Sequence, residues 1–417
     1  MTKALRSSPR VLLALLVVAY IFNFLDRQIL GILAQPIKAE LHLTDTEFGT
    51  IGGLGFALLY SVLGLPLAYL ADRTSRSAVV AASVAVWSVF TALCGMAVSS
   101  TQLFFCRLGV GVGEAGGVAP SYALIADHFP PERRARALAI YSLGVPIGLA
   151  GGSLIGAYLA SWVGWRWAFL LMGAAGVILA PVLLLSVRDP KGFRHGDQAP
   201  ISEVFPLLAR KPSFWLLAFA SSSSSLIGYA LALWTPAVMM RSFHLDLVHT
   251  GQFLSSLLLI GGTAGVFAGG WFADRLGAGN RAWYARLPAI AWIVSAVAWA
   301  AGLLAPNLYA AWLLLLIGNG VNILWLAPVV TSVQHLAPAS MRSTASGCFL
   351  LINNLIGLGA GPLLIGAISD GLKTTYGEDA LRNAAVVGTA FYLLAAMLMF
   401  LASRRLPSDW VDDSPQA

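Results

Sequence analysis

Four ionisable residues, Asp26, Arg27, Arg107 and Glu114, lie inside stretches of sequence that are otherwise almost entirely apolar. A charged side chain at the centre of a bilayer costs roughly 2.5–3.5 kcal/mol even on permissive insertion scales, so four isolated charges would cost on the order of 10 kcal/mol. Charges in such places pair with one another or face water inside a bundle of helices. We therefore expect these four residues to mark the path of a proton, an ion or a polar substrate.

The spacing of these residues predicts how they pair. Arg107 and Glu114 share one helix face and stand about 10.5 Å apart along the axis. Depths counted from the ends of the apolar stretches place Asp26 level with Arg107, and Glu114 within reach of Arg27. An ionised Asp26 would hold Arg107. A protonated Asp26 would release the arginine, which could then bind the anionic headgroup of a substrate. The alternative is a static cluster that joins two helices, although buried ion pairs stabilise less than apolar packing does.

The elements that position these charges are predicted to be membrane-spanning helices. Of the 417 residues, 58% are hydrophobic and 11% are charged, against about 25% charged in soluble domains. Apolar runs of 18 or more residues are candidate spans. Twelve such runs lie approximately at 11–34, 47–71, 78–98, 101–126, 137–160, 165–187, 213–240, 250–272, 287–304, 308–333, 344–369 and 384–402. The fold class expected is an all-α membrane protein with twelve transmembrane helices.

The distribution of Lys and Arg predicts the orientation. With a cytoplasmic N-terminus, the cytoplasmic segments hold nineteen Lys and Arg residues, whereas the outer loops hold four: Lys38, Arg241, Lys373 and Arg382. This is a strong positive-inside bias, and it places both termini in the cytoplasm, in a bacterial inner membrane. The net charge of +7 then reflects topology, so we expect no nucleic-acid partner.

The chain reads as two similar halves. Asp72-Arg73 follows the second run and Asp274-Arg275 follows the eighth, while His128 and His335 follow the fourth and the tenth. A long connection after the sixth run separates the halves. We predict an N-terminal six-helix bundle over 1–187, a cytoplasmic linker over 188–212 and a C-terminal bundle with a tail over 213–417. Two parallel, pseudo-symmetric six-span halves are typical of a large class of transporters.

The repeated charged turns predict a conformational latch on the cytoplasmic side. An Asp at such a turn can accept from helix N-termini, and an Arg can bind C-terminal carbonyl groups. The alternative is that the arginines serve orientation alone. The latch residues expected are Asp72, Arg73, Arg76 and Arg134 in the first half and Asp274, Arg275 and Arg342 in the second.

These motifs carry a family resemblance. Asp72-Arg73-x-x-Arg76, repeated in part at Asp274-Arg275, resembles the signature loop of the major facilitator superfamily, although Ser75 and Ala68 stand where that loop has Gly. The segments 23–27 (NFLDR), 107–115 (RLGVGVGEA) and 164–169 (GWRWAF) resemble the spinster branch of that superfamily more narrowly. The resemblance implies the major facilitator fold. Because eukaryotic spinster proteins export sphingoid phosphates or lysophospholipids, it also implies a substrate of that type.

Two other patterns carry no chemistry. Gly111-x-Gly113-x-x-Gly116 spells a dinucleotide fingerprint, but that motif needs a strand before it, and glycines in a membrane helix permit close packing instead. The three cysteines fall within apolar runs and lack metal-ligand spacing. We therefore expect no metal and no cofactor.

The polarity of the second half is uncharged. It comes from the serines at 221–225 and from several Asn, Tyr and Trp residues. We expect a mainly apolar wall for an amphipathic ligand there, and the charge chemistry in the first half. The expected substrate-binding residues are Asn23, Arg27, Arg107 and Glu114 from the first half and Tyr229, Trp234, Asn319, Asn322, Trp325 and Asn353 from the second.

Together these patterns predict a proton-coupled secondary transporter that works by alternating access as a monomer. Protons, membrane lipids and an amphipathic lipid or related organic anion would be its partners. Uptake of a small hydrophilic organic acid, export of drugs, and a sensor that transports nothing remain alternatives. A lipid enzyme would need a nucleophile–base pair, and all six histidines fall in loops or at the ends of apolar runs, so we expect no enzyme.

Overall fold

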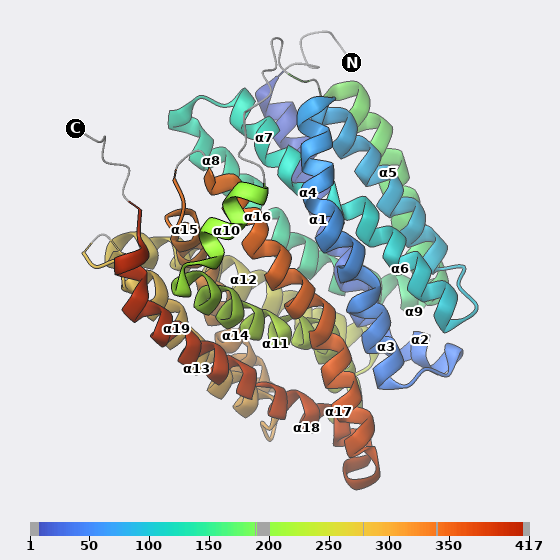
Figure 1. The fold of residues 1–417 in the computed structure, drawn as a ribbon. Coiled ribbons are helices and arrows are strands. Elements are labelled where there is room, and N and C mark those ends of the chain that lie inside the picture. Colours follow the sequence, from blue (N-terminus) through green and yellow to red (C-terminus); the bar gives the residue numbers. More distant parts are fainter. Residues whose placement is uncertain (1–7, 188, 190–200, 278, 339–340, 412–417) are drawn as a thin grey trace, which may run out of the picture. The chain divides into compact units, whose positions relative to one another are not determined.

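The computed structural model describes residues 8–187, 189, 201–277, 279–338 and 341–411, and every regular element in these ranges is a helix. The elements up to residue 186 are α1 (Pro9–Ile32), α2 (Ala34–Leu41), α3 (Asp45–Gly52), α4 (Leu54–Arg73), α5 (Arg76–Cys94), α6 (Ser100–Ala115), α7 (Val118–His128), α8 (Pro131–Ser142) and α9 (Gly144–Ser186) (Figure 1). The later α-helices are α10 (Ile201–Ala209), α11 (Pro212–Ser242), α12 (Leu247–Gly277), α13 (Trp283–Leu303), α14 (Leu308–Asn322), α15 (Leu326–Gln334), α16 (Arg342–Asn353), α17 (Gly361–Tyr376), α18 (Ala380–Gly388) and α19 (Ala390–Asp409). Short 3-10 turns lie at Ile323–Trp325 and Gly377–Asp379, and a π-helix lies at Asn354–Ala360.

The helices form two compact units. The first unit holds Met1–Gly196 and Ala232–Leu259, and the second holds Asp197–Leu231 and Ile260–Ala417. The last part of α11 and the first part of α12 therefore pack with the first unit. The two bundles predicted from the sequence repeat, with boundaries at 187 and 213, describe chain order and stay a prediction. Within each unit we call the end that carries the turns at 42–44, 95–99, 243–246, 304–307 and 377–379 the outer end, after the expected orientation, and the opposite end the inner end.

The twelve predicted spans are present, although only nine helical stretches of the described residues are long and apolar enough by themselves. The stretch Glu132–Ser186 holds two spans, because Gly164 reverses α9 with φ +84° and ψ 162°, backbone angles that only glycine adopts readily. The stretch Thr344–Asp409 also holds two, joined by the turn at Gly377–Asp379. The fourth span consists of α6 and α7 and is interrupted between them. The twelve-helix fold is thus confirmed.

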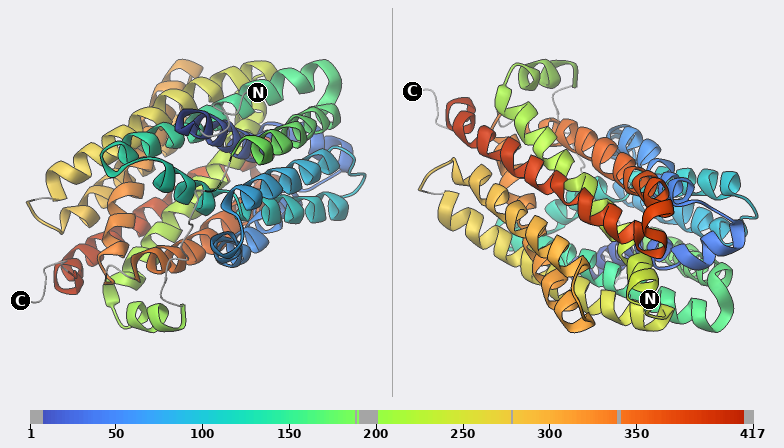
Figure 2. Two further views of the ribbon diagram at one scale, coloured as in Figure 1. Left: turned by 90° about the horizontal axis from the view of Figure 1, so that it is seen from above. Right: turned by 90° about the horizontal axis from the view of Figure 1, so that it is seen from below.

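Close helix packing shapes the first unit. Helix α1 lies beside α9, and α5 lies beside α6 (Figures 1 and 2). A Cβ atom added at Gly111 would stand 2.4 Å from the carbonyl oxygen of Phe56, and one added at Gly113 would stand 2.3 Å from the backbone nitrogen of Trp87. Any larger residue would push α6 away from α4 and α5. The glycines that spell the fingerprint thus serve helix contact, as expected.

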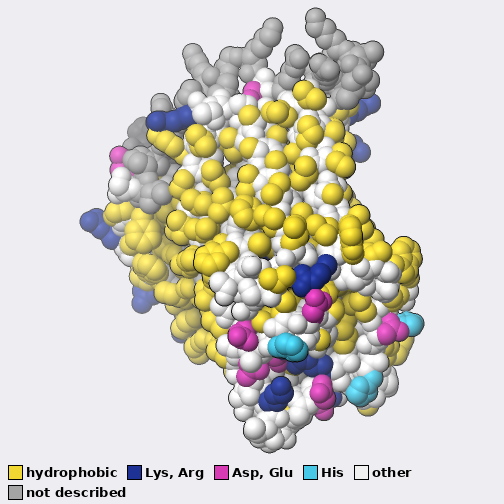
Figure 3. Space-filling model, turned by 90° about the vertical axis from the view of Figure 1, so that its right-hand side faces the viewer, with side chains coloured by type: hydrophobic (Ala, Val, Ile, Leu, Met, Phe, Trp, Pro, Cys, Tyr) yellow, Lys and Arg dark blue, Asp and Glu magenta, His cyan; other side chains and the backbone are white. Residues whose placement is uncertain are grey.

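The expected linker over 188–212 is partly helical. Residues 188 and 190–200 lie outside the described residues. Helix α10 follows, buries Val204 and Leu208 completely and packs against α16 in the second unit. Figure 3 shows a face on which hydrophobic side chains form a broad band, while acidic, basic and histidine side chains gather toward its lower end. This pattern suits a surface surrounded by lipid.

Candidate functional site

The four charged residues predicted from the sequence come together in the interior of the first unit. Asp26, Arg107 and Glu114 are 1%, 2% and 0% exposed. The Arg27 side chain is 13% exposed, so it alone reaches accessible space. Asp26 and Arg27 come from α1, and the other two residues come from one face of α6.

One of the two predicted pairs is present. The Arg27 Nε donates to Glu114 Oε2 at 2.7 Å, and the Asn23 side chain also donates to this carboxylate. The structure differs from the expected pair of Asp26 with Arg107. Asp26 Oδ2 instead accepts from Thr91 Oγ1 of α5 at 3.1 Å, and the described residues include no direct ion pair between Asp26 and Arg107. The close packing of α5 against this cluster brings a hydroxyl to Asp26 that helix depth alone could not predict.

Aromatic rings surround the Arg27 guanidinium. Its Cζ lies 5.0 Å from the ring centre of Phe24, 4.9 Å from that of Phe56 and 4.7 Å from that of Tyr60. The Arg107 Cζ lies 5.2 Å from the same Phe56 ring. Each desolvated cation–π contact is worth about 0.5–2 kcal/mol. The Phe56 ring thus contacts both guanidinium groups, and the rings add to the attraction of the carboxylates.

The sequence analysis missed these rings. Phe24 precedes Arg27 by three residues, and Phe56 and Tyr60 are one turn apart on α4. Residues three or four positions apart lie on one face of a helix, and this spacing could have indicated that the rings lie near Arg27. Further along the first unit, Tyr20 stacks on Tyr141 with ring centres 4.2 Å apart.

Several polar atoms of the cluster have no hydrogen-bond partner within the described part of the chain. They are Asn23 Oδ1, Asp26 Oδ1, Arg107 Nε and Glu114 Oε1. Buried polar atoms are nearly always satisfied by protein groups or by water. Free bonding capacity at both carboxylates and at an arginine suits a site that takes up water, protons or substrate.

The charge balance of the cluster determines what it can bind. Two arginines and two ionised carboxylates sum to zero. A proton taken up by either carboxylate leaves the cluster with one uncompensated positive charge. Because an uncompensated charge is expensive in an apolar interior, the protonated cluster favours an anion.

The second unit contains a polar network without an ionisable group. The Ser225 hydroxyl bonds to Asn353 Oδ1 at 2.9 Å, and the Ser224 hydroxyl bonds to Asn322 Oδ1 at 3.4 Å. The π-helix at Asn354–Ala360 follows directly. π-helical turns are rare and are frequently found at functional sites. The predicted binding residues Asn322 and Asn353 thus meet in one network.

The other predicted binding residues of the second half are dispersed. Asn319 is half-buried on α14, and its Nδ2 has no partner within the described residues. The half-buried Trp325 lies near Trp292 with ring centres 6.2 Å apart, and Tyr229 is half-buried on α11. Trp234 is 0% exposed, belongs to the first unit and packs on Phe48 at 5.6 Å. A substrate would not touch the Trp234 ring in this conformation.

Two of the expected latch residues of the first half, Asp72 and Arg76, form a network at the inner end. Arg76 donates to Asp72 Oδ1 from Nε at 2.9 Å and from a terminal nitrogen at 2.6 Å, and it also pairs with Asp127. Arg134 bonds to the carbonyl oxygen of Ala126 at 2.8 Å. The exposed Arg73 covers the Tyr69 ring at 4.1 Å. The arginine at the start of α5 thus connects α4 to α7, through a partner, Asp127, that the sequence analysis did not select.

The second-half latch differs in its contacts. The Asp274 side chain lies outside the described residues. Arg275 covers the ring of Trp271 at 5.3 Å, and Arg342 lies 3.2 Å from His335 Nδ1. Another aspartate of this unit, Asp409, was missed by the sequence analysis. Its Oδ2 accepts a hydrogen bond from the Ser213 hydroxyl at the start of α11, at 2.5 Å.

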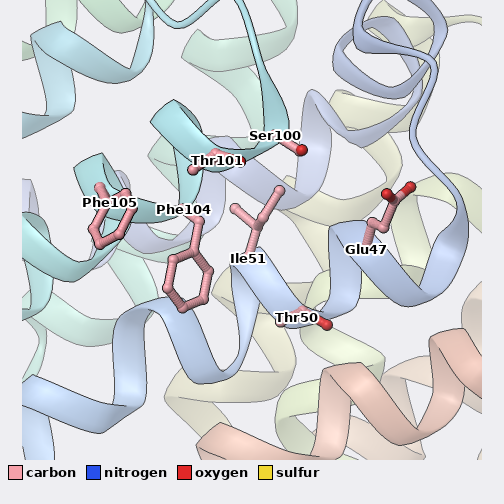
Figure 4. A pocket seen from close by; sticks show the side chains of 7 residues that line it. All are labelled: Glu47, Thr50, Ile51, Ser100, Thr101, Phe104 and Phe105. Carbon is pink, nitrogen blue, oxygen red and sulfur yellow. The ribbon is translucent and has the colours of Figure 1, made fainter.

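A shallow cavity of about 350 Å³ lies at the outer end of the first unit. Figure 4 shows its lining side chains, which come from α3 and α6. Its one ionisable residue, Glu47, accepts from the backbone nitrogen of Thr44 at 2.8 Å as part of a helix cap. None of the lining residues belongs to the charged cluster, and the described residues contain no group of three or more potential metal ligands.

Comparisons with known proteins match the chain over most of its length. The family model described as Major Facilitator Superfamily matches residues 16–362. An "MFS-type efflux pump" of Mycolicibacterium smegmatis is 33% identical over 94% of this chain and 92% of its own length. Human "Protein spinster homolog 1" is 28% identical over 93% of this chain and 82% of its own. A crystal structure of a bacterial homologue of the human lysosomal transporter spinster, inward-facing and unoccupied, has a TM-score of 0.87 and 28% identity, and covers 99% of this chain and 100% of that one.

Proposed function

Since the chain belongs to the major facilitator superfamily and is related to spinster proteins and efflux pumps, we propose that it is a proton-coupled transporter of an amphipathic organic anion. A lysophospholipid or a sphingoid phosphate is the type of substrate proposed. Family membership makes the protein a multi-pass membrane transporter rather than an enzyme. The charged cluster in the first unit carries the proposal beyond the family.

The single observation behind the proposal is the Arg27–Glu114 pair. Arg27 is bonded to a fully buried carboxylate at 2.7 Å and is the only one of the four charges with an exposed edge. Protonation of Glu114 removes its charge, which weakens its attraction for the Arg27 Nε. The surrounding rings keep the guanidinium in place. Its planar fork can then bind a carboxylate or phosphate at two points.

Asp26 and Arg107 would act together with this pair. Arg107 contacts the same Phe56 ring as Arg27, so its positive charge would add to the attraction for a headgroup bound at Arg27. The Asp26 carboxylate, held by Thr91, is a second proton acceptor. Asn23 would orient Glu114. The uncharged network of the second unit, with Asn319, Asn322, Asn353, Tyr229 and Trp325, would contact the rest of the ligand.

Charge balance also predicts the direction of coupling. A proton and an anion together leave the cluster neutral, so the two would bind together and move in the same direction. A cation would compete with the proton for the carboxylates, so the two would exchange. The relative named as an efflux pump supports the second candidate, export of a cationic drug by exchange for protons.

The proposal also covers the oligomeric state of the protein, its membrane and its orientation. The protein would act as a monomer in a bacterial inner membrane with both termini in the cytoplasm, in keeping with the positive-inside bias. The Asp72–Arg76–Asp127 network would hold α4, α5 and α7 together at the cytoplasmic side.

Flux into proteoliposomes under an imposed pH gradient tests the proposal. We expect a fluorescent lysophosphatidic acid to be accumulated when the compartment it leaves is acidic, and expect Glu114→Gln to abolish this dependence on the gradient. Glu378→Gln, which changes an exposed carboxylate outside the cluster, is the control and should keep it. Accumulation of ethidium against the proton flow, with no lysolipid flux, would establish the second candidate instead.

A further inference from the structure

Two of the three cysteines face each other across the contact of α5 with α6. Cys94 is the last residue of α5, at the outer end, and is 0% exposed, whereas Cys106 lies in the second turn of α6 and is half-buried. Both are free thiols in this structure, and the two thiol groups lie within hydrogen-bonding reach of each other. The sequence analysis gave them no chemistry, because spacing alone does not show that two side chains on different helices meet.

The register of the two helices explains why the thiols meet. A Cβ atom added at Gly109 would stand 2.3 Å from the Phe90 ring, and one added at Gly113 would stand 2.3 Å from the backbone nitrogen of Trp87. Positions 113, 109 and 106 lie on one face of α6, and positions 87, 90 and 94 lie on one face of α5, because each step is three or four residues. The close approach that the glycines permit thus continues to the two cysteines. A disulfide requires such an approach.

The thiol pair lies beside the charged cluster of the first unit. Cys106 directly precedes Arg107 in α6. Thr91, which donates to Asp26 at 3.1 Å, lies one turn before Cys94 in α5. A bond between the two sulfur atoms would therefore join the part of α5 that carries Thr91 to the part of α6 that carries Arg107.

We propose that Cys94 and Cys106 form a redox-sensitive modification site, which a hydroperoxide oxidises to a disulfide that ties α5 to α6 beside the charged cluster. Cysteines that sense oxidants are accessible and often lie next to a second, resolving cysteine. Cys106 suits the first role because its side chain is partly exposed, and the buried Cys94 suits the second. Hydrogen peroxide is small and uncharged, so it can reach a thiol among apolar side chains.

The oxidation takes place in two steps, one at each sulfur atom. The Cys106 sulfur attacks one oxygen of hydrogen peroxide and the O–O bond breaks. The other oxygen leaves as water with the thiol proton, and Cys106 becomes a sulfenic acid. The Cys94 sulfur then attacks the Cys106 sulfur, and the hydroxyl group leaves with the Cys94 proton as a second water. The two sulfur atoms together lose two electrons, and the peroxide is reduced by the same two electrons.

Thiol counting after peroxide treatment tests the site. Purified protein is treated with hydrogen peroxide, unfolded in SDS and labelled with a maleimide that carries a long polymer, so that each free thiol adds one step in apparent mass. The reduced chain should take three labels, and the oxidised chain should take one, at Cys348. Dithiothreitol should restore all three, because a disulfide is reversible whereas a sulfonic acid is not. The oxidised protein should also have a higher thermal transition, since a cross-link restrains the unfolded chain.

The chain offers matched variants. Cys348→Ser removes a buried thiol of the second unit and should still lose both remaining labels on oxidation. Cys94→Ser leaves Cys106 without a resolving partner, so a sulfenic acid should accumulate and be trapped by dimedone. Cys106→Ser should keep both of its labels after peroxide, because Cys94 is buried.

Three outcomes would overturn the proposal. They are a full set of labels on peroxide-treated wild type, an equal loss of label in Cys106→Ser, and a loss that dithiothreitol does not reverse. The measurement uses neither substrate nor pH gradient, so its result is independent of the proposed proton coupling.

Discussion

The polar interior of the first unit is charged, and that of the second is neutral. In the first, Arg27 and Glu114 form a buried ion pair, with Asp26 and Arg107 beside it. In the second, serine hydroxyls bond to asparagine amides. Asp26 and Glu114 of the first unit and Ser224 and Asn353 of the second are all buried, so the two units bury polar groups of different kinds. Charges change with proton uptake, and amides do not.

This difference between the units indicates where transport could be coupled to proton uptake. Among the residues that the structure describes, the buried Asp and Glu side chains of the charged cluster lie in the first unit, so the proposed proton chemistry would belong there. The second unit can recognise a ligand by hydrogen bonds and apolar contact, but it cannot respond to pH through these residues. A repeated fold has thus retained one architecture with two kinds of polar interior.

The largest effect expected within this comparison is on stability in the first unit. Arg27→Met keeps much of the side-chain volume but leaves Glu114 buried without a counter-ion. Removing one partner of a buried pair costs about 3–5 kcal/mol. We expect a correspondingly lower thermal transition in detergent at neutral pH. Adding Glu114→Gln should restore most of the loss, and a double variant as unstable as the single one would contradict the pairing.

A smaller effect is expected in the second unit. Asn353→Ala removes the acceptor of the Ser225 hydroxyl at 2.9 Å. An unsatisfied buried group costs about 1–3 kcal/mol. The loss should be the same at pH 5 and pH 8, because no charge is involved. A pH-dependent loss would break the contrast between the units.

The shared ring offers a finer test within the first unit. Phe56→Leu keeps an apolar side chain but removes the aromatic ring that both guanidinium groups contact. We expect a loss of about 0.5–2 kcal/mol in stability and weaker binding of anionic ligands, measured by titration calorimetry. Phe56→Trp, if it folds, should bind anions at least as well as Phe56→Leu does. Equal affinity in the wild type and in Phe56→Leu would show that the ring does not position the arginines.

The smallest effect concerns Glu40 at the outer end of the first unit. Hydrogen bonds from Trp165 at 2.6 Å and from Arg166 at 2.9 Å lower the pKa of this carboxyl. The Glu40 carboxylate therefore stabilises the folded state fully above its unfolded pKa of about 4.3. This stabilisation is lost as the pH falls through the lower folded pKa. Glu40→Gln should slightly flatten the acid limb of a stability–pH curve. Glu378→Gln, outside this cluster, serves as the control, and an identical curve for Glu40→Gln would contradict the assignment.

Much of the fold could be predicted from sequence because its signals are local. Apolar runs define spans by length, and the repeat of Asp72-Arg73 at Asp274-Arg275 indicates two halves. The pair of Arg27 with Glu114 followed from depth along straight helices. The Thr91 bond to Asp26 could not be predicted, because it depends on how far α5 rotates and approaches. The same holds for the Phe56 ring, whose position depends on the contact at Gly111.

Long-range packing also explains why the sequence could not indicate that Trp234 is buried. Its aromatic type and polar neighbours suggested a binding wall. Only the three-dimensional course of α11 shows that its ring is covered by Phe48. The same course brings Arg241 to Asp45, 196 residues earlier in the chain, which no local pattern could indicate.

The reversal at Gly164 has a consequence for how the protein enters the bilayer during synthesis. A single residue separates the two helical arms of α9, so there is no hydrophilic loop between them to be carried across. The arms can therefore insert together as one hairpin. Trp162 and Trp167, which are 75% and 57% exposed beside the reversal, suit the headgroup region and can anchor the tip there. A side chain at position 164 would then impair biogenesis before it affected transport.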